Sequence, residues 1–208
     1  MALKLTNLKK DIYQTDIDES VIFFDNFFEI KLQTKPCLFL VDSHKQFEQI
    51  ISKPMPNWLT GYNVYNLIFI LHPDKWQTES NHQYSPDKFK ATLKHEICHI
   101  YFKKITGSSQ PIWLNEGLAL YISGQLKFRK DRGKLDNFLQ FSTDNTIGNQ
   151  TVYDQSGFAV QTLHQKYGKQ KLLKLIKSIK TLKSIEKFSP LFQKIYNLPL
   201  AYQTFNSQ

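Results

Sequence analysis

Short apolar runs separated by amphipathic segments dominate the first half of the chain. The runs Cys37 to Asp42 and Val64 to Leu71 have strand length and are bounded by polar residues, which predicts two β-strands. A helix is expected over Ser43 to Ile51, and helix and turn before residue 33. Proline and glycine residues predict a loop over 52–63. Strands flanked by helices indicate an α+β arrangement.

The second half has helical periodicity. Ser85-Pro86-Asp87 combines a capping hydroxyl, a proline at the first helical position and an acid in the first turn, which is a strong helix start. Helices are expected over roughly 85–104, 111–123, 154–168 and 169–183. Pro190 and Pro199 are expected to interrupt the tail.

Composition adds a charge excess to this picture. The 208 residues include 27 Lys and Arg against 18 Asp and Glu, a net charge of +9, and 41% are hydrophobic. This composition excludes a disordered or fibrous chain and favours one domain. The charge attracts anionic partners, which include acidic peptides. No signal peptide or membrane-length apolar run is evident, so a cytoplasmic protein is expected.

Two smaller features have plain structural interpretations. Lysines recur every three residues over 171–183. They indicate a solvated helix face, with a docking surface for acidic partners as the alternative, and without interleaved aromatics they are no specific nucleic-acid signal. Cys37 and Cys98 are too few for a disulfide framework, and both are interpreted as core residues.

The chemistry centres on His-Glu-Ile-Cys-His at residues 95–99. Inside a helix, positions i and i+4 lie about 40° apart in azimuth, so His95 and His99 project from one face and can bind one metal ion. Glu96 lies about 100° from His95. It therefore flanks the metal, where a general base for a metal-bound water belongs. The alternative is a polar helix face with two incidental histidines.

Glu116 is the candidate third ligand. It lies in an otherwise apolar helix, where a carboxylate is unfavourable without a compensating cation or hydrogen bonds. Two histidines and a glutamate form one of the standard ligand sets of catalytic zinc. Gly117 is expected to let this helix approach the His95–His99 helix. The alternative is that Glu116 faces solvent at the helix start.

The pattern H-E-x-x-H followed by W-L-N-E-G-L-A-x-Y over residues 113–121 resembles the gluzincin zinc metallopeptidases, especially peptidase MA-like domains. The resemblance implies His95, His99 and Glu116 as zinc ligands and Glu96 as the catalytic base. It also implies a zincin-like two-lobed core, with a small mixed sheet and the active-site helix in an N-terminal lobe (1–104) and a helical C-terminal lobe (105–208). Together the lobes form one domain over 1–208.

The segment from Tyr153 to Val160 is similar to one that follows in these domains. The resemblance implies that Tyr153 places its hydroxyl on the developing oxyanion, and His164 is a second candidate on the same helical stripe. The alternatives are a packing or capping tyrosine and a surface histidine. A G-x-M-E-N-like segment is missing and Leu120 replaces an acid found in some gluzincins, so internal and terminal cleavage both stay open.

These features predict a zinc-dependent peptidase that uses one zinc ion and acts on peptide or protein substrates, with a bias toward acidic ones. The first alternative is a gluzincin-fold binding protein that holds zinc without turnover. The second is a basic nucleic-acid-associated protein in which the motif is accidental. Neither the physiological substrate nor the oligomeric state follows from the sequence.

Overall fold

The computed structural model describes residues 13–129, 132–142, 150–182 and 184–206. The chain forms two compact units, residues 1–100 and 101–208, and the boundary falls inside one long helix, α4 (Pro86–Thr106).

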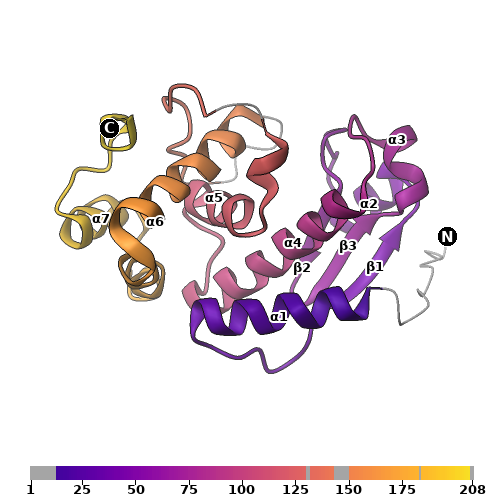
Figure 1. Cartoon of the computed structure of the whole chain (residues 1–208), viewed down its shortest axis with the longest axis horizontal. Coiled ribbons are helices and arrows are strands. Elements are labelled where there is room, and N and C mark those ends of the chain that lie inside the picture. Colours follow the sequence, from indigo (N-terminus) through magenta and orange to yellow (C-terminus); the bar gives the residue numbers. More distant parts are fainter. Residues whose placement is uncertain (1–12, 130–131, 143–149, 183, 207–208) are drawn as a thin grey trace. The chain divides into compact units, whose positions relative to one another are not determined.

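The first unit is a small sheet with helices (Figure 1). Its elements before α4 are α1 (Gln14–Phe28), β1 (Cys37–Val41), α2 (His44–Ile51), β2 (Gly61–Val64), β3 (Leu67–Leu71), a 3₁₀ turn (Pro73–Lys75) and α3 (Trp76–Glu79). The strand order is β1-β3-β2, with β1 parallel and β2 antiparallel to β3. This mixed sheet confirms the α+β prediction.

The expected second strand is wrong in one respect. Val64 ends β2 and Leu67 begins β3, with Tyr65 at a positive φ of 52° in the turn between them. The run Val64 to Leu71 therefore covers parts of two strands, and the end of the expected loop over 52–63 is strand. Strand β3 is central and β2 lies at an edge.

The core of the first unit lies between the sheet and its helices. Fully buried residues come from α1 (Phe24, Phe28), from β3 (Ile68, Ile70) and from α4 (Leu93, Ile97). Helices α1 and α4 run side by side, because Lys90 Nζ lies 2.9 Å from Asp16 Oδ1 and Lys94 Nζ lies 3.6 Å from the centroid of the Phe23 ring. This packing fixes α4 up to the start of the motif at His95.

The second unit is helical. Its elements after α4 are α5 (Ile112–Ile122), a 3₁₀ turn (Gln125–Phe128), α6 (Gln150–Ile179), a second turn (Ile185–Lys187), α7 (Phe188–Tyr196) and α8 (Tyr202–Asn206). Gly168 interrupts α6 with φ 81° and ψ 163°, as expected from the sequence. Pro190 does not interrupt the tail, since it lies in the first turn of α7, where a missing N–H is tolerated.

The second unit is built around α5. Trp113, Leu114, Leu118 and Ala119 have no exposed surface. The Trp113 ring contacts Phe138, Phe188 and Phe205 from three later segments of the chain. Within the ranges that the structure describes, no helix is long and apolar enough to cross a membrane.

Candidate metal centre

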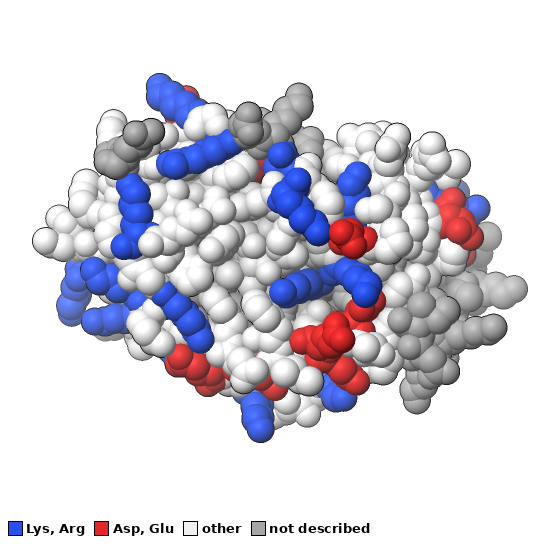
Figure 2. All heavy atoms as spheres, in the orientation of Figure 1, with Lys and Arg blue, Asp and Glu red and all other residues white. Residues whose placement is uncertain are grey.

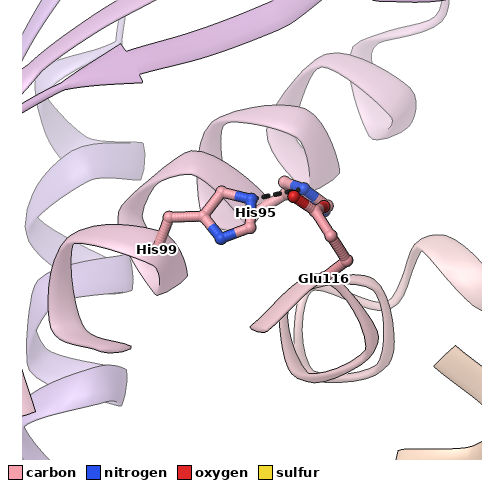
Figure 3. A group of neighbouring side chains, drawn as sticks. All are labelled: His95, His99 and Glu116. Carbon is pink, nitrogen blue, oxygen red and sulfur yellow. Dashed lines mark hydrogen bonds between the residues drawn. The ribbon is translucent and has the colours of Figure 1, made fainter. Parts of the chain in front are cut away.

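Helix α4 presents the two motif histidines to each other (Figure 3). His95 and His99 lie one turn apart, with their Nε2 atoms separated by 2.9 Å and their rings at 86°. At this separation one ring donates to the other, so both Nε2 atoms face the same small region. The helical spacing thus produces the expected pair of nitrogen donors on one face of α4.

Glu116 in α5 completes a cluster. One ligand atom from each of His95, His99 and Glu116 lies within 4.8 Å of the other two, and the Glu116 carboxylate points toward the His95 ring (Figure 3). Among the residues with a described position, this is the one group of three or more His, Cys, Asp or Glu side chains with such geometry. The three side chains are close enough to hold a metal ion.

The donor set fits a divalent transition metal. Zinc–nitrogen bonds of about 2.0–2.1 Å in tetrahedral geometry separate two nitrogens by roughly 3.3 Å. The Nε2 atoms of His95 and His99 are 2.9 Å apart, so the rings need to open by only about 0.4 Å to share such an ion. Imidazole nitrogen also suits copper, nickel and iron. The three residues could therefore hold a metal ion of this class.

Glu96 is buried beside the histidine face, with 5% of its surface exposed. Strand β2 lies directly against it: a Cβ added to Gly61 would come within 2.9 Å of Glu96 Oε1 and 2.7 Å of Thr92 Cγ2. Thr92 and Glu96 form the stripe of α4 adjacent to that of His95 and His99. The sequence does not predict this contact, because the prolines and glycine of residues 52–63 predict a loop that includes residue 61. The alternation of Tyr62 and Val64 after Gly61 was the available signal.

Gly117 supports close helix packing, but not the packing expected. A methyl group there would overlap the Ser156 carbonyl oxygen and come within 2.8 Å of Val160 Cγ2. Its nearest neighbours thus belong to α6 rather than to the His95–His99 helix. The glycine after Glu116 allows α5 and α6 to meet at backbone distance.

The oxyanion candidates both lie on α6. Tyr153 is half-buried in the first turn of the helix, and its role stays a prediction. His164 is half-buried, and its Nδ1 lies 3.0 Å from the Tyr121 hydroxyl. Burial, followed by the charge of Lys169, lowers the pKa of His164. His164 is not part of the metal cluster.

The two cysteines differ in burial. Cys98 is fully buried in α4, as expected, whereas Cys37 is exposed. The core assignment of Cys37 is wrong, because this residue opens β1 and the first three residues of that strand are exposed or half-buried.

Basic side chains are spread over the drawn face of the molecule, with acidic side chains among them (Figure 2). Lys171, Lys174 and Lys177 are exposed on α6, and Lys180 is exposed directly after its end, in agreement with a solvated helix face. Lys183 lies outside the described residues.

Neither the known protein-family models nor the curated protein sequences include a match to this chain.

Proposed function

We propose that this protein is a zinc metallopeptidase that hydrolyses peptide bonds, with Glu96 as its general base. The observation that carries the proposal is the approach of His95, His99 and Glu116 to within 4.8 Å of one another. A histidine pair and one carboxylate leave a fourth position open on a tetrahedral ion, as catalytic zinc sites do and structural sites do not.

Each residue of the site has a proposed role that follows from its position. His95, His99 and Glu116 would hold the ion, which when bound supplies Lewis acidity and lowers the pKa of a coordinated water toward about 7. The Glu96 carboxylate takes a proton from the attacking water and later donates it to the leaving amine nitrogen. Its burial at 5% exposure keeps the carboxylate in one place beside the histidines. Tyr153 is proposed to stabilise the oxyanion with a hydrogen bond from its hydroxyl group.

The gluzincin assignment belongs to the same proposal. It rests on H-E-x-x-H in a helix and on the glutamate of the N-E-G sequence in the next long helix. The zincin-like core with lobes 1–104 and 105–208 is part of it. The substrate class is peptide or protein, with a bias toward acidic sequences from the net charge of +9.

Glu96→Gln tests the proposal. The purified chain is incubated with a peptide library, with and without a chelator and with zinc added back, and products are identified by mass spectrometry. Wild type should cleave in a chelator-sensitive way. Glu96→Gln should lose cleavage and retain zinc, because the base is removed while the ligands remain. Glu19→Gln, at an exposed position of α1, is the matched control and should cleave normally.

The outcomes separate the alternatives. Cleavage that persists in Glu96→Gln contradicts the proposed mechanism. Zinc binding without cleavage by wild type would favour the non-catalytic gluzincin-fold binding protein. Absence of zinc binding would favour an accidental motif.

A further inference from the structure

The loop before β2 is held at every carbonyl group from residue 56 to residue 60, a segment called here the clamped loop. The acceptors and donors are Pro56 O with Leu59 N at 3.0 Å, Asn57 O with Asn81 N at 3.2 Å, Trp58 O with His82 Nε2 at 2.9 Å, Leu59 O with His44 Nε2 at 2.9 Å, and Thr60 O with Leu71 N at 2.9 Å. A connecting loop with five successive carbonyls satisfied has little freedom to shift.

Two of these donors are histidine side chains that the metal cluster does not use. His44 opens α2, and its backbone N–H donates to Glu79 Oε2 at 3.0 Å. His82 precedes α4, and its backbone N–H donates to Ser80 Oγ at 3.2 Å. Each imidazole is therefore anchored at its own backbone while its Nε2 reaches the loop. The two rings tie the loop to two separate segments.

The clamped loop leads directly to the Glu96 side chain. Thr60 is buried, and the next residue, Gly61, lies so close to α4 that an added Cβ would be 2.9 Å from Glu96 Oε1. This gap is smaller than a methyl group, so the position of β2 sets the space available to the carboxylate. A displacement of the loop would remove one of the contacts that confine the Glu96 carboxylate.

We propose that His44 and His82 are positioning residues, which hold β2 against α4 and so fix the Glu96 carboxylate in its working place. The proposal rests on the proposed function for the role of Glu96 as base. The histidines act through the loop and do not touch substrate or metal. Imidazole suits this task because its Nε2–H donates to a carbonyl whether the ring is neutral or charged.

The test compares variants that lack the histidine N–H donor with variants that carry an amide N–H donor in its place. His44→Leu and His82→Leu remove the N–H, whereas His44→Gln and His82→Gln place an amide N–H near the former Nε2. His72→Leu is the matched control, since His72 lies at the end of β3 and does not reach the clamped loop. Zinc content, kcat and KM for peptide cleavage, and hydrogen exchange of the Gly61–Val64 amides are measured for each variant.

The leucine variants should show exchange in β2 about 10-fold faster and kcat about 10-fold lower, because each variant loses one hydrogen bond of the loop. Zinc content should stay at one per chain and KM should change little. The glutamine variants should recover both properties, and His72→Leu should resemble wild type. Unchanged kcat, a loss confined to KM, or glutamine variants as impaired as the leucine variants would overturn the proposal.

Failure of the proposed function can be distinguished from failure of the positioning role. If wild type cleaves no peptide, the peptidase proposal fails, and hydrogen exchange alone then decides whether the histidines hold β2. Unchanged exchange in both leucine variants would overturn the positioning role. If a leucine variant fails to fold, its glutamine counterpart supplies the comparison, because normal exchange and kcat support the role and faster exchange overturns it.

Discussion

Replacing Gly117 by alanine tests how closely α5 and α6 pack beside Glu116, the candidate third metal ligand. The added methyl would lie 2.7 Å from the Ser156 carbonyl carbon and 2.8 Å from Val160 Cγ2, and it would overlap the Ser156 carbonyl oxygen. Optimal carbon–carbon contacts lie at about 3.5–4.0 Å. The two helices would therefore have to separate by roughly 0.8 Å or more, because the main obstacle is backbone and cannot rotate away.

Two opposing terms set the size of the effect. Alanine in place of glycine in a helix stabilises by about 1 kcal/mol. Overpacking against a backbone group costs about 3 kcal/mol, at the upper end of the usual range. The net destabilisation is about 2 kcal/mol, which corresponds to a melting temperature lower by roughly 4–8 °C for a chain of this size.

Gly157→Ala is the matched control for this measurement. Its methyl would lie 2.6 Å from Leu126 Cδ2 and 3.2 Å from Leu120 Cβ, and the first of these atoms is the end of a side chain that can turn aside. The same gain in helix propensity then offsets the crowding, and the expected change in stability is within about 1 kcal/mol of zero. Calorimetric melting of wild type and the two variants is the assay. A Gly117→Ala variant that melts at or above the wild-type temperature would refute the packing argument.

Three further changes test other parts of the structure. Gly61→Ala should lower kcat by about 10-fold or more without loss of zinc, because its methyl enters the space of the Glu96 carboxylate; normal kcat would contradict the close contact. Tyr196→Phe should stabilise the chain by about 1 kcal/mol in urea unfolding, because the buried hydroxyl has no hydrogen-bond partner among the described residues and burial raises its pKa. Burial and the charge of Lys169 lower the pKa of His164 in the folded chain. As the pH falls below about 6.5, the unfolded chain therefore binds the proton first, and the free energy of unfolding decreases. His164→Gln should reduce the difference in unfolding free energy between about pH 7 and pH 5, and an unchanged difference would contradict this assignment.

Local signals in the sequence predicted the helices and the metal cluster well. The Ser85-Pro86-Asp87 start and the break at Gly168 match the structure, because capping and positive φ are decided by a few neighbouring residues. The histidine pair of the metal cluster could be predicted for the same reason, because His95 and His99 need only helical spacing to share one face of the helix. The approach of Glu116 was inferred from ligand chemistry, because spacing along the chain does not determine it.

Features that depend on long-range packing were missed. Strand β2 has a mixed pattern of polar and apolar residues, and its pairing with β3 and contact with α4 arise only in the folded unit. The sequence predicts α4 as the neighbour of Gly117, whereas its nearest neighbours lie on α6. A glycine in an apolar helix indicates close approach but does not identify the partner helix. The hydrogen bonds of His44 and His82 do not follow from the sequence either, because each ring donates to a carbonyl 15 or 24 residues away.

The central claim is that His95, His99 and Glu116 bind one metal ion. Protein stripped with a chelator and titrated with zinc in a calorimeter tests it most directly, with His99→Ala and Glu116→Ala as ligand variants and His72→Ala and Glu19→Ala as controls. Wild type and the controls should bind one zinc per chain, and each ligand variant should lose affinity by about 100-fold or more. A wild-type chain that binds no zinc, or ligand variants that bind it as tightly as wild type, would contradict the claim.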